Sequence, residues 1–130
     1  MSVDWARRYC LSLPHTTEQV QWGNDLVFKV GGKMYAVLAL EPAAMWLSFK
    51  CTPEGFAELT ERPGIIPAPY LARAQWVALE CEEALSARET RQLLRQSYEL
   101  VLARLPKKAR AELARISHPN RLPNQRREGK

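Results

Sequence analysis

The chain has 130 residues and a formal net charge of +5, with 46% hydrophobic and 25% charged side chains. This length and composition favour one globular domain and exclude a disordered or fibrous chain. No apolar run approaches the ~20 residues of a membrane helix, and the N-terminus carries an early acid, Asp4, where a signal peptide has an apolar core. We therefore expect a cytoplasmic protein that has no membrane partner.

The positive charge is concentrated in the C-terminal third of the sequence. Residues 87–130 hold twelve basic and four acidic side chains, whereas residues 51–86 hold two basic and six acidic ones. Contacts from Lys and Arg to phosphates are the sequence-independent part of nucleic-acid binding, so this asymmetry favours a polyanionic partner. The alternative interpretation is a solvated tail that keeps the protein soluble.

A helix and a short strand are expected first along the chain. Ser2 can cap the helix, Asp4 lies in its opening turn, and Pro14 ends it. A strand around residues 17–22 follows, and a turn at residues 23–25 leads into the next pair of strands.

The segment 26–38 is predicted to be a β-hairpin with Gly31 and Gly32 in its turn. Glycine tolerates the positive φ that a two-residue primed turn requires, and the twist of such turns matches that of the strands. A two-residue loop also sets the register. The expected pairs are Val30 with Lys33, Phe28 with Tyr35, and Leu26 with Val37.

A strand, a short helix and a packed loop are expected after the hairpin. The side chains of residues 45–51 show the two-residue alternation that predicts a strand. One face of this strand carries Met45, Leu47, Phe49 and Cys51. The hydroxyl of Thr52 can cap a helix that ends at residues 62–64, and the proline-rich segment 64–71 is predicted to be a packed loop.

A last strand at residues 76–81 and a long helix complete the predicted fold. A capping box, Ser86 with Glu89, opens the helix, which runs to about Leu105. Its predicted buried stripe is Leu94, Tyr98, Val101 and Leu105. Residues 107–116 can add one or two helical turns, and residues beyond 117 lack periodicity and are expected to be disordered. This order of elements is typical of an antiparallel α+β fold with helices packed on one face of the sheet.

No catalytic or metal-binding pattern is evident in the sequence. Cys10, Cys51 and Cys81 are widely spaced in apolar segments, so we expect core residues, with a reactive thiol as the alternative for Cys51 at a strand end. His15 is expected in a loop, and His118 lies far from it. The sequence therefore predicts no catalytic residue, no metal site and no cofactor.

Basic side chains interleaved with aromatic ones are the strongest functional signal. Aromatic faces stack on bases, and cations contact phosphates. Lysines at hairpin tips also protect sheet edges, which is the structural alternative. The residues that can share an exposed sheet face or a hairpin tip are Lys29, Lys33, Lys50, Arg73, Trp22, Trp46 and Trp76.

Four sequence blocks resemble the MmcQ/YjbR family of small bacterial proteins, over residues 2 to about 108. The blocks are Leu13-Pro14 with Thr17-Glu18; residues 28–36; Ile66-Pro67 with residues 70–73 and Trp76-Val77; and residues 97–101 leading to 105–108. The chain departs from the family pattern after Arg110, where a long basic segment extends past the usual end.

The resemblance implies a CyaY-like, frataxin-type two-layer sandwich and a DNA-binding role in which hairpins act as wings. The family-like basic residues are Lys29, Lys33, Arg73, Lys107 and Lys108. With Lys50, Trp76 and Arg110 they make up the predicted DNA-binding site. A frataxin-like fold also raises metal binding, but Asp4 is the one acid on the first helix, beside Arg7 and Arg8, which does not match an acidic ridge.

We thus predict an α+β domain over residues 1–108 and a basic, partly disordered extension over residues 109–130. The predicted function is non-enzymatic binding of nucleic acid, with duplex DNA as the partner. The alternative is a protein- or small-ligand-binding module with a pocket between the sheet and the Pro63–Trp76 loop. A third interpretation is an enzyme whose catalytic residues the sequence does not reveal.

Overall fold

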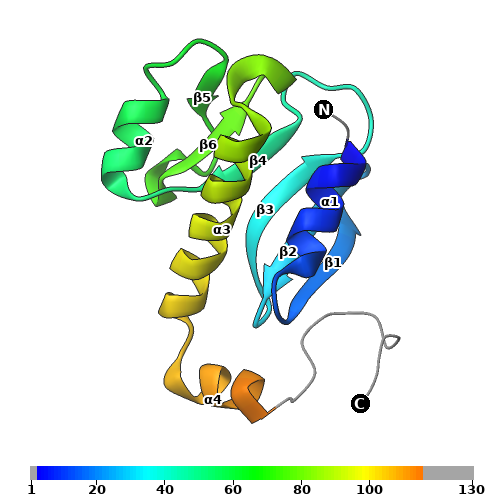
Figure 1. Ribbon diagram of the computed structural model, residues 1–130, viewed down its shortest axis with the longest axis vertical. Helices are drawn as coiled ribbons and strands as arrows, with labels where there is room; N and C mark the ends of the chain where they lie inside the picture. Colours follow the sequence, from blue (N-terminus) through cyan, green and yellow to red (C-terminus); the bar gives the residue numbers. More distant parts are fainter. Residues whose placement is uncertain (1–2, 116–130) are drawn as a thin grey trace.

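A computed structural model describes residues 3–115, in which four α-helices accompany a six-stranded sheet (Figure 1). The helices are α1 (Val3–Ser12), α2 (Pro53–Leu59), α3 (Ala87–Arg104) and α4 (Lys107–Arg115). The strands are β1 (Thr16–Gln21), β2 (Asp25–Val30), β3 (Lys33–Ala39), β4 (Leu47–Lys50), β5 (Ile65–Pro67) and β6 (Trp76–Leu79). Their order in the sheet is β1-β2-β3-β4-β6-β5, and every neighbouring pair is antiparallel. The predicted α+β class is confirmed.

Helices α1, α2 and α3 cover one face of the sheet, which we call the inner face (Figure 1). Cys10 of α1, Leu59 of α2 and Leu94 of α3 join the strand residues in one hydrophobic cluster. The buried stripe predicted for α3 is correct, since all four of its side chains are buried. The predicted capping box is also present, with Ser86 and Glu89 each bonded to the other's backbone N–H.

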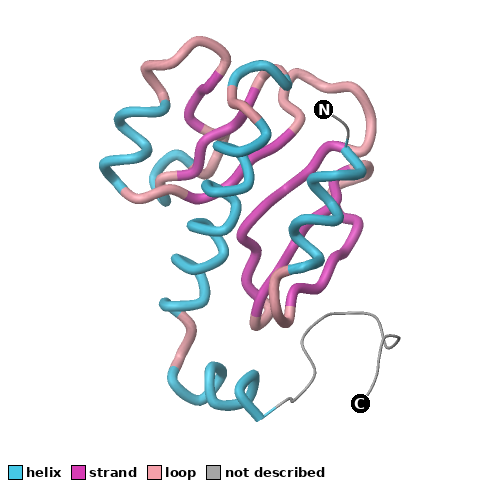
Figure 2. Tube along the Cα trace, in the orientation of Figure 1, coloured by secondary structure: helices cyan, strands magenta, loops and turns pink. Residues whose placement is uncertain are grey.

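The opposite, outer face carries a smaller hydrophobic cluster. Ala68, Trp76 and Ala78 are buried there, and Met34 and Leu71 pack against them. This cluster is covered by the segment between β5 and β6, which is mostly loop and contains one short 3₁₀ helix, Ala72–Ala74 (Figure 2). The outer face is therefore only partly covered, and none of the described α-helices joins this cluster.

The β2–β3 hairpin has the predicted turn, with positive φ at Gly31 and Gly32, but its register differs from the prediction. The register shifts between Phe28 and Lys29, so Phe28 pairs with Ala36 and Leu26 pairs with Leu38. Tyr35 is the extra residue of this β-bulge. A bulge places two residues opposite one, and here both Tyr35 and Ala36 enter the inner cluster.

The Tyr35 side chain gives the physical reason for the bulge. Its hydroxyl lies 2.9 Å from Thr16 Oγ1 and donates to the Cys10 carbonyl at 3.2 Å. Its ring meets that of Tyr98 edge-on, with centroids 5.4 Å apart. These partners hold the Tyr35 ring on the inner face. In a regular strand, successive side chains alternate between the two faces, so either Tyr35 or Ala36 would lie on the inner face, but not both.

Three local predictions are wrong. Segment 64–71 contains the short edge strand β5, because Ile65–Pro67 pairs with β6. Strand β4 begins only at Leu47, so Met45 packs in the outer cluster and not beside Leu47. Cys81 is exposed, because β6 ends at Leu79 and the chain then leaves the sheet.

Helix α4 crosses the predicted domain boundary at residue 108. Its Leu113 packs against the inner cluster, so residues 109–115 are helical and make contact with the core. The segment predicted to be disordered, the cap residue Ser2 and His118 lie outside the described residues. Within residues 3–115, the helices are all too short or too polar to cross a membrane.

Candidate functional site

The antiparallel topology brings four strand ends together at one end of the sheet. Lys33 begins β3, and Lys50 ends the neighbouring β4. Lys50 is also the register partner of Trp76, the first residue of β6. The Lys50 ammonium donates to the Ala74 carbonyl oxygen at 2.6 Å. Because Arg73 precedes Ala74 in the chain, this bond brings Lys50 close to Arg73.

Helix α3 ends at the same place. A Cβ built on Gly31 in the hairpin turn lies 2.5 Å from the Leu105 side chain, so the turn touches the end of α3. Burial and the charge of Arg104 lower the pKa of Lys50, which places Arg104 near Lys50. Two residues beyond Leu105, α4 opens with a pair of lysines. We call this surface the basic end: Lys29, Lys33, Lys50, Arg73, Arg104, Lys107 and Lys108.

Most cations of the basic end are open to solvent. Lys33, Arg73, Lys107 and Lys108 are exposed, as is Arg110 further along α4. Lys29 donates to Gln19 Oε1 at 3.0 Å. Because an ammonium has three donor hydrogens, Lys29 and Lys50 each retain donors for a phosphate beside their internal bonds. Sequence reasoning missed Arg104, whose position in the last turn of α3 is the signal that could have found it.

The tryptophans do not share the predicted exposed face. Trp76 is 4% exposed in the outer cluster, so its ring has no surface with which to stack on a base. Trp46 is half-buried against the inner cluster. Trp22, in contrast, is 64% exposed in the turn between β1 and β2. Of the three interleaved tryptophans, Trp22 is the one that is largely open to solvent.

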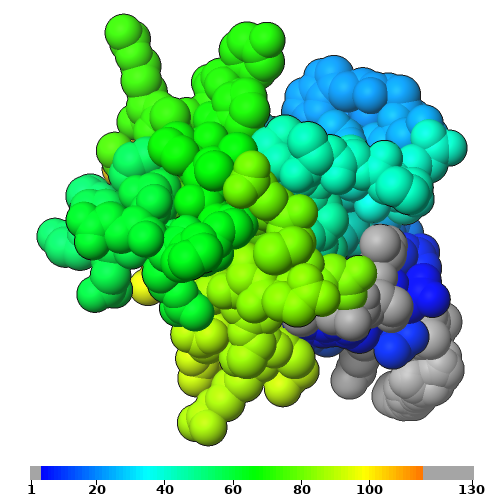
Figure 3. All heavy atoms as spheres, turned by 90° about the horizontal axis from the view of Figure 1, so that it is seen from above, coloured from blue at the N-terminus to red at the C-terminus, as the bar shows by residue number. Residues whose placement is uncertain are grey.

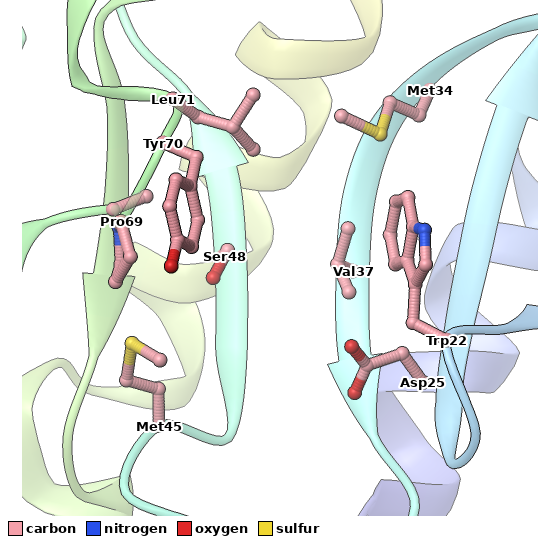
Figure 4. Close-up of a pocket in the computed structure, with 10 residues that line it drawn as sticks. Trp22, Asp25, Met34, Val37, Met45, Ser48, Pro69, Tyr70 and Leu71 are labelled. Carbon is pink, nitrogen blue, oxygen red and sulfur yellow. The ribbon is translucent and has the colours of Figure 1, made fainter.

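A pocket of about 470 Å³ lies on the outer face, between the sheet and the segment 68–71. Trp22, Asp25, Met34 and Val37 line one side of it (Figure 4). The other side is lined by Met45, Ser48, Pro69, Tyr70 and Leu71 (Figure 4). In the space-filling view, the green segment around residues 60–75 lies beside the cyan segment, and a notch at the edge of the molecule lies between the green and blue segments (Figure 3).

The rim of this pocket carries two exposed aromatic side chains in unusual backbone conformations. Trp22 has a φ of 51° and Tyr70 a φ of 66°. Bulky residues rarely adopt this left-handed region, and such residues concentrate at ligand-binding sites. Tyr70 is fully exposed, so no burial of its own ring offsets the strain.

Among the described residues, the thiols and carboxylates offer no comparable site. Burial raises the pKa of the Cys10 and Cys51 thiols to about 12, so Cys51 is not a reactive thiolate at neutral pH. Across residues 3–115, no group of three or more Cys, His, Asp or Glu side chains is arranged to hold a metal ion.

A sequence model of the YjbR family matches residues 11–100. The chain belongs to the YjbR family. Among solved structures, the chain is similar to Deinococcus radiodurans protein DR2400, which has a DUF419 domain: they are 32% identical, with a TM-score of 0.76, over 97% of this chain and 95% of that one. A Pseudomonas syringae protein shares the fold, with 23% identity and a TM-score of 0.63 over 77% of this chain and 98% of its own. No curated protein matches the sequence.

Membership of the YjbR family confirms the resemblance seen in the sequence. The matched region contains the whole sheet and the outer-face pocket, and it ends within α3. The basic end therefore has two parts: Lys29, Lys33, Lys50 and Arg73 inside the matched region, and the cations of residues 104–108 just beyond it.

Proposed function

We propose that this YjbR-family protein is a non-enzymatic, cytoplasmic DNA-binding protein, and that the basic end is its contact surface. The observation that carries the proposal is the convergence of cations from residues 29–108 at one end of a single sheet. Such a cluster attracts phosphates irrespective of base sequence. The hairpin turn and the start of α4 are the parts of this surface that fit a DNA backbone, in the arrangement of a CyaY-like fold with hairpin wings.

The direct test is fluorescence anisotropy of a labelled DNA duplex at several salt concentrations. We expect binding that weakens steeply with salt, because each neutralised phosphate releases counterions. Lys33→Ala should weaken binding and make the slope of log K against log salt shallower by about 1, which is the loss of one phosphate contact. The triple change Lys33→Ala, Lys107→Ala and Lys108→Ala should make it shallower by about 3.

Arg88→Ala is the matched control. Arg88 is an exposed cation in the first turn of α3. At ~1.5 Å per residue it lies about 24 Å along the helix from Arg104. Its removal should leave the salt slope unchanged. The proposal would be contradicted by absence of binding at ~100 μM DNA, which is the weak end of non-specific affinity. It would also be contradicted if the Lys33 and Arg88 variants lost DNA affinity equally.

A truncation separates the folded surface from the C-terminal segment. Residues 116–130 contain four basic residues and one acidic residue. A chain ending at Arg115 keeps Leu113 and its packing, so its melting temperature should match that of the full chain. We expect it to retain part of the DNA affinity, with a shallower salt slope. If the truncated chain loses all binding and Lys33→Ala has no effect in the full chain, the segment 116–130 is the binding element.

The outer-face pocket favours a second candidate function, the binding of a small ligand. Its volume of about 470 Å³ lies within the ~300–1,000 Å³ of small-molecule sites, and its lining is mostly apolar with a few polar groups. It also lies between the sheet and residues of the Pro63–Trp76 loop, where the alternative function inferred from the sequence places a pocket. Binding of a metabolite by a protein that does not bind DNA would favour this function over the first.

A further inference from the structure

The pocket and the basic end are continuous on the outer face. Lys29 is the register partner of the pocket residue Met34. Lys50 follows the pocket residue Ser48 by two positions, so both lie on the same strand face about 6.6 Å apart along β4. A ligand that occupies the pocket therefore has cations within reach at one end.

The opposite end of the pocket has different chemistry. Asp25 is the one charged residue that lines it, at the start of β2, whereas the cations lie near the end of β2 and of β4. A carboxylate accepts hydrogen bonds from amino and ring N–H groups. The pocket thus offers an acceptor at one end, apolar and aromatic walls in the middle, and phosphate-binding cations at the other end.

The aromatic walls favour a flat ligand. Trp22 projects from one side of the pocket, and Tyr70 and Leu71 project from the other (Figure 4). Flat nucleobases stack on such rings, and single-stranded nucleic acids are commonly bound in this way. Both Trp22 and Tyr70 have left-handed backbones, and backbone strain of this kind clusters where side chains clamp ligands.

We propose that this pocket binds an unpaired nucleotide, with the base between Trp22 and Tyr70 and the phosphate toward Lys29 and Lys50. An amino group of the base donates to Asp25. The inference deepens the proposed function, on which its phosphate contacts rest, by assigning the unpaired nucleotide to a defined site. A free mononucleotide and an unpaired nucleotide of a DNA strand both carry a base and a phosphate that fit this site.

The experiment compares three probes on the full chain: a 12-nucleotide single strand, the duplex of the same sequence, and AMP. Anisotropy reports binding of the two DNA probes. Isothermal titration calorimetry reports binding of AMP, because its signal does not depend on the Trp22 ring that one variant removes. We expect Tyr70→Gly and Trp22→Gly to weaken single-strand binding about ten-fold each, the scale of one lost base stack. Duplex binding should not change in either variant, because the cations of the basic end remain.

Glycine is chosen because it accepts positive φ without strain, so both variants should keep the wild-type melting temperature. Val20→Ala is the matched control: Val20 is an exposed apolar residue that does not line the pocket, and its removal should leave all three affinities unchanged. If the Tyr70→Gly variant melts at the same temperature as the wild type, its weaker binding does not come from loss of the fold.

The outcomes separate this inference from the proposed function. If binding of the single strand depends on Trp22 and Tyr70, the ligand is an unpaired nucleotide of a DNA strand. If AMP binding depends on Trp22 and Tyr70 but neither DNA probe binds, the ligand is a free nucleotide, and the proposed function is overturned. Binding of both DNA probes that is indifferent to Trp22 and Tyr70 overturns the inference and leaves the proposed function standing. Failure of all three probes to bind overturns both.

Discussion

Gly31→Val is expected to destabilise the protein by about 2–6 kcal/mol, and Gly32→Val by about 1–3 kcal/mol. Both glycines have positive φ, 59° and 80°, where a β-branched residue is strained. A Cβ on Gly31 also lies 2.5 Å from Leu105 Cδ1, inside contact distance of a buried side chain. Among the described residues, nothing lies within 4 Å of a Cβ on Gly32. Gly32→Val therefore isolates the backbone strain.

Urea denaturation of the two variants measures this difference. A double-mutant cycle with Leu105→Ala identifies its cause, because the smaller side chain gives the added methyl groups room. The free-energy losses of Gly31→Val and Leu105→Ala should then sum to more than the loss of the double variant, by about 0.5–3 kcal/mol. Equal losses for Gly31→Val and Gly32→Val would show that the contact with Leu105 does not limit the turn.

Features that depend on neighbouring residues were predictable from the sequence. The Gly31-Gly32 turn, the capping box at Ser86 and the cap at Thr52 each use chemistry within four residues. The buried stripe of α3 follows from helical periodicity over a long segment. These signals were enough for the α+β class and for the order of the elements other than β5.

Features that depend on distant partners were not predictable. The bulge at Tyr35 follows from bonds to Thr16 and Cys10, which are 19 and 25 residues away. Strand β5 has only three residues, and its pairing with β6 makes it a strand. Hydrophobic alternation in a single sequence contains no information about either contact.

The candidate site shows the same division. The sequence revealed the excess of basic residues, but only the sheet order shows that β2, β3, β4 and the segment just before β6 present them at one end. Trp76 was grouped with Trp22 as an exposed ring, yet the β5–β6 segment covers Trp76 and leaves Trp22 in solvent. The partnership of Trp22 with Tyr70 across a pocket joins residues 48 positions apart.

Ser97 has an unusual place in this fold. Its hydroxyl accepts from the Lys50 backbone N–H at 2.9 Å and donates to the Tyr35 carbonyl at 2.6 Å. The β3–β4 ladder stops at the pair Ala36 and Phe49, so Tyr35 and Lys50 are the next pair along. The fully buried hydroxyl thus stands between two backbone groups that an unbroken ladder would join directly. It fixes α3 to both strands beside the basic end.

Ser97→Ala is expected to lower the free energy of unfolding by about 2–6 kcal/mol. The change leaves a buried N–H and a buried C=O without their partner, and each such loss costs roughly 1–3 kcal/mol. Urea denaturation should show a lower midpoint with an unchanged m-value. Hydrogen exchange gives a local measurement, because the Lys50 amide should lose protection more than the amide of Phe49.

Thr90→Val is the matched control on the same helix. Thr90 is also fully buried, and its hydroxyl donates to the Ser86 carbonyl, which accepts from the Thr90 backbone N–H as well. Removing that hydroxyl leaves the carbonyl with a partner, so the loss should stay below about 1.5 kcal/mol. If Ser97→Ala costs no more than Thr90→Val and Lys50 stays protected, Lys50 and Tyr35 bond directly in the variant. The hydroxyl would then be replaceable at this junction, and the position of Lys50 in the basic end would depend on the strand pairing alone.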